Sequence, residues 1–272
     1  MSTTERRHAF LQEMGLAPLW VRRDHHATEM PQDNENPLPE MAEELAWRAA
    51  PEQPVEVVPI VDISPASSEP AIAHASENAI APLDWIPLQE MVSGCKTCGL
   101  CHGRTRTVFG TGDQKARWLF VGEGPGRNED MQGLPFVGPA GKLLDNMMAA
   151  MGLRRGDNTY IANIVKCRPT DGNKRDRPPT QEEAAACMPY LERQIALINP
   201  TVIIALGKTA ALSLLALDPA TPVSRLRGSV HRYAGKPLIV TYHPAYLLRN
   251  MRDKGKTWAD LCLAMETFRQ TA

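Results

Sequence analysis

Short apolar segments alternate with longer amphipathic ones from Trp118 to the C-terminus. Four of the short segments are rich in β-branched or aromatic residues, as buried strands are: WLFVG (118–122), TYIANIV (159–165), TVIIALG (201–207) and PLIVTYH (237–243). The amphipathic stretches predict helices at Gly141–Met151, Gln181–Ile198, Lys208–Leu217 and Lys256–Arg269. Strands that alternate with helices predict an α/β fold with a mostly parallel sheet covered on both faces. Ligand sites in such sheets lie at the carboxyl ends of the strands.

Upstream of about residue 85 this pattern is absent. The stretch Pro31–Pro87 holds ten prolines and no glycine, with many Ala, Ser and Glu residues. Such a segment buries too little apolar surface to offset the entropy lost on ordering. We therefore expect three parts: a short peptide at 1–24, a disordered acidic linker at 25–85, and a folded domain at 86–272.

The segment at residues 6–23, RRHAFLQEMGLAPLWVRR, is an apolar cluster between two arginine pairs. A large aromatic residue beside arginines on a flexible tether suits docking into a groove of a partner protein. The segment resembles the N-terminal peptide of the clamp-loader psi subunit, which implies a replication clamp-loader or another repair protein as the partner. The alternative is an amphipathic helix that folds back on the domain.

Charge is distributed unevenly along the chain. Residues 1–90 carry five Arg and no Lys against sixteen Asp and Glu, a balance of −11, whereas residues 91–272 have a balance of +10. A basic domain can attract a polyanion such as DNA, because the phosphates it neutralises release counterions. A solvated basic surface is the other interpretation. No apolar run approaches the roughly 18 residues of a membrane span, and the N-terminus lacks a secretory pattern. We expect a cytoplasmic, nucleoid-associated monomer.

Six cysteines without an export signal argue against a disulfide framework. Cys95 and Cys98 form a CxxC turn, and Cys167 and Cys187 supply two more thiols. Four such thiolates can bind zinc or an iron–sulfur cluster, and the spacing alone does not decide between them. Cys101 is a rival ligand, because CxxCxxC also occurs in ferredoxin-like sites.

A glycine-rich loop, Gly122-Glu-Gly-Pro-Gly126, follows the first predicted strand. Glycines let the backbone approach a ligand closely. The loop is not a nucleotide fingerprint, because GxGxxG fails at Arg127, and the later Gly207-Lys-Thr fails as a phosphate loop.

Several blocks in one order resemble the family 4 uracil-DNA glycosylases, from about Cys95 to Arg269. The blocks are Cys95-x-x-Cys98, Arg104-x-x-x-Val108-x-Gly110, Gly122-Glu-Gly-Pro-Gly126, Glu129-Asp130, Gly133-x-Pro-Phe-Val-Gly138, Asn163-Ile-Val-Lys-Cys167-Arg-Pro169 and His243-Pro-Ala-Tyr-Leu-Leu-Arg249. The resemblance implies a three-layer α/β/α sandwich as the fold. It implies the removal of uracil from DNA as the activity. It also implies a structural [4Fe–4S] cluster, and the ligands it assigns are Cys95, Cys98, Cys167 and Cys187.

The resemblance places the chemistry at the strand ends. Phe136 would stack on the flipped uracil. The protein backbone at Gly122 and Gly124 would approach the base closely. The Asn163 amide would pair with the uracil edge as both donor and acceptor. His243 would donate a hydrogen bond to uracil O2 as charge develops there.

The remaining roles concern the DNA and the water. Leu247 would fill the gap left in the base stack, with Leu248 as the second choice and Arg249 on a phosphate. Where the best-known glycosylase family has a water-activating aspartate, this loop has Gly124, so the general base is in doubt. Glu123 and Asn173 are the candidates for orienting the attacking water. Glu129 would shape the pocket so that it excludes thymine. A non-catalytic module that binds DNA or a clamp loader is the alternative function.

Overall fold

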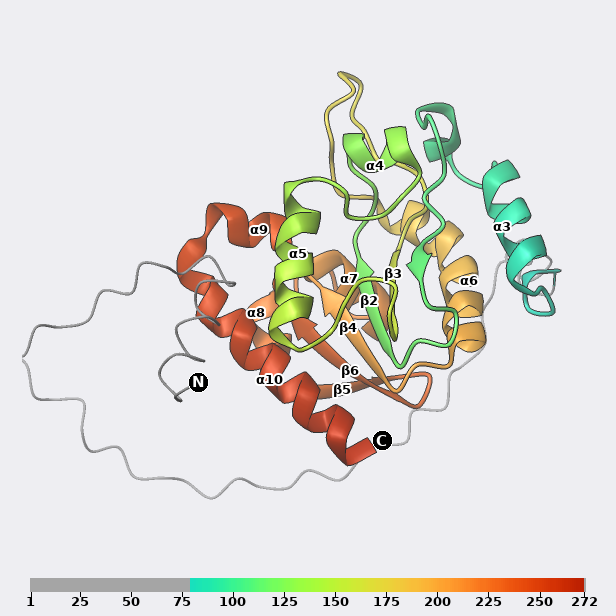
Figure 1. Cartoon of the computed structure of the whole chain (residues 1–272). Coiled ribbons are helices and arrows are strands. Elements are labelled where there is room, and N and C mark those ends of the chain that lie inside the picture. Colours follow the sequence, from blue (N-terminus) through green and yellow to red (C-terminus); the bar gives the residue numbers. More distant parts are fainter. Residues whose placement is uncertain (1–78, 272) are drawn as a thin grey trace, which may run out of the picture. The chain divides into compact units, whose positions relative to one another are not determined.

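The computed structural model describes residues 79–271, and Figure 1 shows its central sheet between two layers of helices. The peptide expected at 1–24 and the linker up to residue 78 lie outside the described residues. Residues upstream of the expected boundary at residue 86 pack on the domain, because Ile80 is buried in the core and Arg193 Nε donates to the carbonyl oxygen of Leu83.

Six strands form one sheet in the order β1-β3-β2-β4-β6-β5. The inner four run parallel, and the two edge strands β1 and β5 are antiparallel to their neighbours. The strands are β1 (Thr111–Gly112), β2 (Trp118–Gly122), β3 (Thr159–Asn163), β4 (Val202–Leu206), β5 (Val230–Tyr233) and β6 (Lys236–Thr241). Every residue of β2, β3 and β4 is buried, as expected for parallel strands covered on both faces. The expected α/β sandwich is confirmed.

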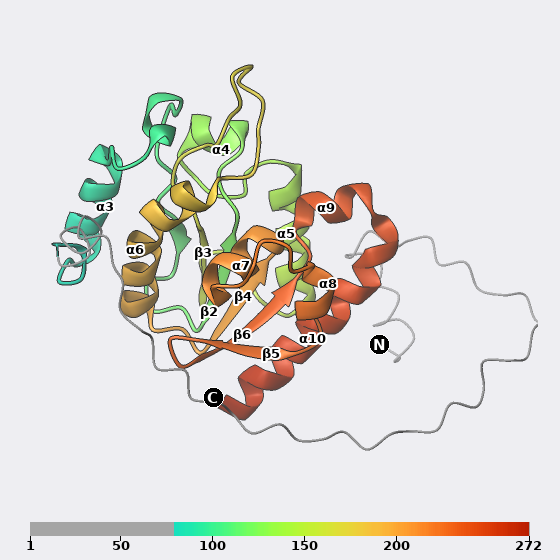
Figure 2. The same cartoon turned by 180° about the vertical axis from the view of Figure 1, so that it is seen from behind.

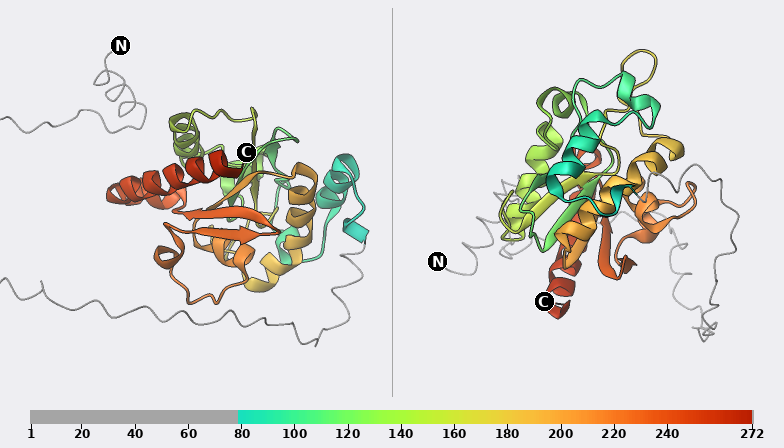
Figure 3. Two further views of the ribbon diagram at one scale, coloured as in Figure 1. Left: turned by 90° about the horizontal axis from the view of Figure 1, so that it is seen from below. Right: turned by 90° about the vertical axis from the view of Figure 1, so that its right-hand side faces the viewer.

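Helices cover both faces of this sheet. One face carries α5 (Pro139–Ala150), α9 (Pro244–Arg249) and α10 (Lys254–Thr271), which enclose a core with Phe120, Leu144 and Ile204. Figure 2 shows the opposite face with α6 (Gln181–Ile198) and α7 (Lys208–Leu215), and α3 (Trp85–Gly94) packs on the outside of α6. Shorter helices complete the domain: η1 (Gly99–His102), α4 (Arg127–Gln132), α8 (Val223–Leu226) and η2 (Met251–Asp253). The end-on views in Figure 3 show the same layering.

The helix that was predicted most accurately has strong end signals. Helix α6 begins at a capping box, in which Thr180 Oγ1 accepts from the backbone of Glu183 and the Glu183 carboxylate accepts from the backbone of Thr180. It ends where Asn199 takes a left-handed conformation. The sequence did not predict α3, α4, α9 or the edge strand β5, which are short or partly exposed.

The strand order reverses direction at β2. From β2 the chain goes to β3 on one side and then to β4 on the other side. At such a switch point the connections leave in opposite directions, which opens a crevice at the carboxyl ends. Within the described residues no helix is long and apolar enough to cross a membrane.

Candidate active site and thiol site

A cavity of about 230 Å³ lies at the carboxyl ends of β2, β3 and β6. We call it the base pocket. Six of the predicted site residues line it: Glu123, Gly124, Glu129, Phe136, Asn163 and His243. The pocket therefore gathers residues that are up to 122 positions apart in the chain, from Glu123 to Ala245.

Asn163 ends β3 and lies opposite Gly122, the last residue of β2. Its side chain is buried, and its Oδ1 atom has no hydrogen-bond partner among the described residues. A buried carbonyl oxygen without a partner is costly, so one that faces a cavity indicates a missing donor from a ligand. Gly122 does not line the cavity itself but packs against two residues that do, Asn163 and Phe136. A Cβ there would lie 2.5 Å from Asn163 Oδ1 and 2.6 Å from the Phe136 ring, so only glycine leaves both groups in place.

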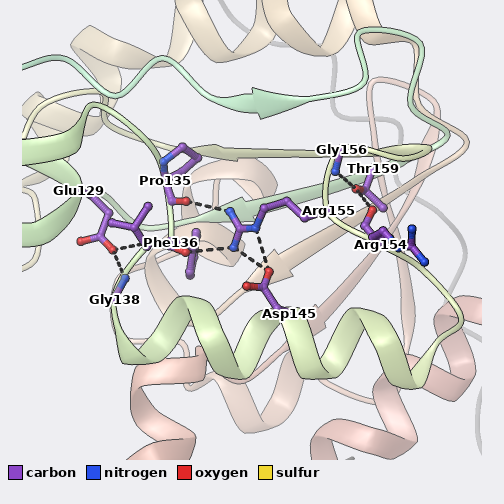
Figure 4. Close-up of polar contacts among 10 residues, drawn as sticks. Glu129, Pro135, Phe136, Gly138, Asp145, Arg154, Arg155, Gly156 and Thr159 are labelled. Atoms are coloured by element: carbon purple, nitrogen blue, oxygen red, sulfur yellow. Dashed lines mark hydrogen bonds and ion pairs between the residues drawn. The ribbon is translucent and has the colours of Figure 1, made fainter.

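Phe136 lies in a backbone conformation that a bulky residue rarely takes, with φ of 54°. Figure 4 shows how the loop is fixed: Arg155 donates to the carbonyl oxygens of Pro135 and Phe136, at 3.0 and 2.9 Å, and pairs with Asp145. On the other side, Glu129 Oε1 accepts from the backbone N–H groups of Val137 and Gly138, at 2.9 and 3.0 Å. Strain held by its surroundings in this way is typical of functional sites.

The close packing of this loop also depends on Gly141 in helix α5. A Cβ on Gly141 would lie 1.8 Å from the carbonyl oxygen of Phe136. The ring of Phe136 stacks against His243, with centroids 5.5 Å apart and planes 30° apart. The loop therefore holds the ring in one orientation before any ligand arrives.

His243 caps the N-terminus of α9, and its Nδ1 accepts from the backbone N–H of Ala245 at 3.1 Å. Burial lowers the pKa of His243 from 6.5 to about 4, with Arg249 acting in the same direction and Glu129 opposing it. The imidazole is therefore neutral at pH 7. Since Nδ1 is the acceptor, the proton lies on Nε2, which is available as a donor.

Glu123 lines the base pocket beside Gly124, and its carboxylate accepts from the Thr209 hydroxyl. Asn173 is not in the pocket. It lies exposed on the loop between β3 and α6, where its backbone N–H donates to Asp171. The structure therefore does not bring Asn173 together with the other predicted site residues, and its role in orienting water stays a prediction.

Two residues of the same loop that the sequence analysis missed line the pocket: Asp176 and Arg177. Asp176 pairs with Arg168, and Arg177 makes a bidentate ion pair with Glu183. The only available signal was position. A segment that joins the end of β3 to the helix carrying Cys187 has to pass the carboxyl edge of the sheet.

The predicted wedge residues differ in exposure. Leu247 is 1% exposed and packs in the core with α5, whereas Leu248 is 43% exposed. Adjacent residues on a helix point about 100° apart, so only one of the two can face DNA. The first choice, Leu247, is therefore wrong, and Leu248 is the exposed candidate. Arg249 is exposed beside it.

A second cavity is surrounded by thiols, and we call it the thiol site. All four predicted ligands line it, and so does Cys101, together with Arg104, Lys166 and Tyr190. Cys95 and Cys98 come from the segment between α3 and η1, Cys167 follows β3, and Cys187 lies on α6. Cys262 is on α10 and does not line the cavity.

Three sulfurs of the thiol site already have a polar neighbour in the protein. Arg104 Nη1 donates to Cys167 Sγ at 3.1 Å, the backbone N–H of Lys166 donates to Cys187 Sγ at 3.3 Å, and Cys95 Sγ lies 3.2 Å from the Thr97 hydroxyl. Burial raises the pKa of Cys98, Cys167 and Cys187, that of Cys187 to about 12. Thiols of this kind need a cationic group to become thiolates at neutral pH.

The donor set at the thiol site consists of cysteine sulfurs that line one cavity. Such sulfurs are ligands of zinc and of iron–sulfur clusters. Over residues 79–271 no three His, Cys, Asp or Glu side chains are grouped closely enough to hold one metal ion.

Comparisons with known proteins agree with this geometry. The profile of the Uracil DNA glycosylase superfamily matches residues 109–263. A Type-4 uracil-DNA glycosylase of Thermotoga maritima is 47% identical over 168 residues, which cover 61% of this chain and 84% of that protein. The Type-4 enzyme of Pyrobaculum aerophilum is 40% identical over 187 residues, covering 66% and 93%, respectively. A Type-5 uracil-DNA glycosylase of the same organism is 30% identical over 156 residues, covering 52% and 67%.

Proposed function

Because the chain belongs to the type-4 uracil-DNA glycosylases of the Uracil DNA glycosylase superfamily, we propose that it hydrolyses the N-glycosidic bond of uracil in DNA and leaves an abasic site. The observation that carries this proposal is the buried Asn163 Oδ1, which has no partner in a pocket also lined by Phe136 and His243. Uracil inside a duplex is out of reach, so the nucleotide is flipped into the pocket at a cost of a few kcal/mol.

Base recognition rests on the Asn163 amide and the Phe136 ring. Uracil N3–H would satisfy Asn163 Oδ1, and the amide Nδ2 would donate to uracil O4. Cytosine has no proton at N3 and carries an amino group at C4, so it would leave both amide atoms facing like groups. Glu129 shapes the wall against thymine through the loop that it holds.

His243 stabilises the leaving group. As the bond between uracil N1 and C1′ breaks, its electron pair leaves with the base and negative charge gathers on O2 and O4. The neutral imidazole donates its Nε2 proton in a hydrogen bond to O2, while Ala245 holds Nδ1. This donor is in place before the reaction begins, so no reorganisation is required when the charge appears.

Water completes the hydrolysis. Its oxygen bonds to C1′ of the oxocarbenium-like sugar, one of its protons is released, and the uracil anion takes up a proton. Glu123 is the carboxylate proposed to orient this water, and the hydrogen bond from Thr209 fixes its position. Asn173, on the exposed loop, does not line the base pocket.

The thiol site is proposed to hold a [4Fe–4S] cluster through Cys95, Cys98, Cys167 and Cys187. Once bound, the cluster supplies four iron–thiolate bonds that fasten the α3–η1 segment to β3 and α6. It is structural, because the thiol site and the base pocket share no lining residue. Cys101 lines the same cavity and remains the rival ligand.

DNA is proposed to lie across the mouth of the base pocket. On one side, Leu248 would fill the gap left by the flipped base and Arg249 would contact a phosphate. On another side, the loop between β3 and α6 projects beyond the strand ends in Figures 1 and 2, and the side chains of Lys174 and Arg175 are exposed on it. In contrast, Arg168 and Arg177 of that loop are engaged by carboxylates.

Partners other than DNA rest on the N-terminal segment. Residues 6–23 lie outside the described residues, and we retain the proposal that they dock onto a clamp-loader or another repair protein. The catalytic domain is proposed to act as a monomer in the cytoplasm. The rival function, a non-catalytic DNA- or clamp-loader-binding module, requires the wild-type protein to bind DNA without excising uracil.

Incubation with a uracil-containing oligonucleotide, followed by alkali cleavage at abasic sites, tests the function directly. The wild-type protein should produce strand breaks at uracil and not at cytosine. Asn163→Ala and His243→Ala should both lose most of this activity while remaining folded. An inactive wild-type protein that carries its full iron content would contradict the proposal and favour the binding module.

A further inference from the structure

A fully buried ammonium group lies between the thiol site and the base pocket. Lys166 is 1% exposed, and its Nζ donates to the carbonyl oxygen of Asn163 at 2.9 Å and to Gln194 Oε1 at 2.6 Å. Both acceptors are uncharged. No carboxylate within residues 79–271 forms an ion pair with this ammonium. A buried charge without a counterion is strongly unfavourable, so a negative charge nearby would stabilise this ammonium.

The thiol site can supply such a charge. Lys166 lines the same cavity as the cysteines, and its backbone N–H donates to Cys187 Sγ. Four thiolates around a cluster carry a net negative charge, which would attract the buried ammonium.

The other end of Lys166 acts on base recognition. Its ammonium holds the carbonyl oxygen of Asn163, the residue whose amide faces the pocket without a partner. The next residue, Ile164, donates its N–H to the carbonyl oxygen of Gly122 at 2.9 Å. The peptide that carries the amide is therefore fixed on one side by the sheet and on the other by the Lys166 ammonium.

We propose that Lys166 is a positioning residue that couples the two sites: its charge offsets that of the thiolate site, and its hydrogen bond to Asn163 fixes the amide that reads uracil. The proposal rests on the proposed function for its second half. Its first half concerns iron retention and stands independently. Lys166 itself touches neither the base nor the sugar, so its effect on the reaction passes through Asn163.

The first test measures iron in the full-length holoprotein. Lys166→Met shortens the unbranched side chain by one heavy atom and removes its charge and its donors. Outer-shell changes typically cost 10- to 100-fold in metal affinity, so iron should pass to a chelator roughly 10 to 100 times faster than from the wild type. Asn163→Ala, which leaves the ammonium in place, should release iron at the wild-type rate. Equal release rates for Lys166→Met and the wild type would overturn the first half.

The second test is a double-mutant cycle on uracil excision. Single-turnover rates are compared for the wild type, Lys166→Met, Asn163→Ala and the double variant, each at matched iron content. A displaced catalytic group can cost on the order of 100-fold, so we expect Lys166→Met to lower the rate by roughly 10- to 100-fold. In the Asn163→Ala background the same change should cost less than about twofold, because its target is gone. Losses that multiply would show that Lys166 does not act through Asn163.

Gln194→Leu is the matched control. It removes the other acceptor of the ammonium from the same buried network but keeps the charge and the bond to Asn163. Iron release and excision rate should stay within roughly threefold of the wild type. A loss as large as that of Lys166→Met would point to general core damage and overturn the proposal.

If Lys166→Met does not fold, Lys166→Gln enters the same cycle with the same criteria. A wild-type protein that excises no uracil would refute the proposed function alone, because the iron test would still decide the role of Lys166.

Discussion

The base pocket and the thiol site lie around the same end of strand β3, but they differ in whether their polar atoms have hydrogen-bond partners. In the base pocket, Asn163 Oδ1 has no partner and Phe136 is held in a strained conformation. In the thiol site, donors such as Arg104 and the Lys166 backbone already face the sulfurs. Unsatisfied groups are what a site for a transient ligand requires, whereas donors from the fold around the sulfurs suit a site with a structural role.

This contrast predicts that the two sites fail in different measurements. Damage to the thiol site should appear as loss of iron and stability, and damage to the base pocket as loss of rate in a stable protein. The five predictions below test the separation.

The largest effect is expected at the thiol site. Cys187→Ser removes a buried thiol from α6 that we propose as a cluster ligand, so the iron content should fall and the free energy of unfolding should drop by about 4 kcal/mol or more. Iron analysis and thermal unfolding measure both. Cys262→Ser, outside the thiol site, is the control and should retain its iron. A Cys187→Ser protein with wild-type iron would assign the ligand role to Cys101.

The next effect is expected in the base pocket. His243→Ala removes the proposed donor to uracil O2, and loss of one such donor costs roughly 100- to 1,000-fold in rate. Single-turnover excision measures this loss, while the iron content should match that of the wild type. If His243→Ala loses its iron, the two sites are not separable in the way that we describe.

Helix α9 provides a comparison between two adjacent leucines. Leu247→Ala should lower the free energy of unfolding by about 2–5 kcal/mol, because its side chain is buried in the core. Leu248→Ala should change stability by less than about 0.5 kcal/mol. The Leu248→Ala change should instead reduce excision from duplex DNA by roughly tenfold, because flipping a base out of a duplex costs a few kcal/mol. Excision from single-stranded DNA should fall much less. The reverse result would restore Leu247 as the wedge.

A smaller effect is expected from crowding the wall of the base pocket. Gly122→Ala places a methyl group against Asn163 and Phe136, which should cost about 1–3 kcal/mol of stability and lower the excision rate. Gly172→Ala is the matched control, since nothing lies within 4 Å of a Cβ there. Differential scanning calorimetry and excision assays compare the pair. Similar behaviour of the two variants would mean that the wall is more adaptable than its contacts indicate.

The smallest effect concerns pH. Because the pKa of His243 is lowered from 6.5 to about 4, the excision rate should show no His243-dependent change as the pH passes through 6.5. The unfolded chain takes up this proton first, so His243 costs stability as the pH falls from 6.5 towards 4 and costs none above that range. Rate and unfolding profiles across this range check both statements. An acid limb at pH 6.5 that disappears in His243→Ala would contradict them.

Much of the base pocket could be predicted from the order of residues along the chain. Asn163 and His243 follow the ends of parallel strands, and such ends always meet at one edge of the sheet. The four thiols were predicted as a set for a different reason. Few roles suit so many cysteines in a chain that resembles an iron–sulfur family, and the structure places them around one cavity.

The structure differs from these predictions where packing decides. Leu247 and Leu248 are equivalent in sequence, and only the contact of α9 with α5 determines which one is buried. Ile80 belongs to a proline-rich stretch by composition, yet it is buried in the core. Asn173 and Asp176 lie three residues apart on one loop, and only the turn of that loop brings Asp176 to the pocket.

The sequence by itself determined the four inner strands, the main helices and the chemical types gathered at the strand ends, because hydrophobic periodicity is a local property of the chain. Only the tertiary structure decided which of two neighbouring side chains faces the solvent, which carbonyl the Lys166 ammonium holds, and that Asn163 Oδ1 lacks a partner. Those facts depend on contacts between segments that are distant in the chain, and no local pattern encodes them.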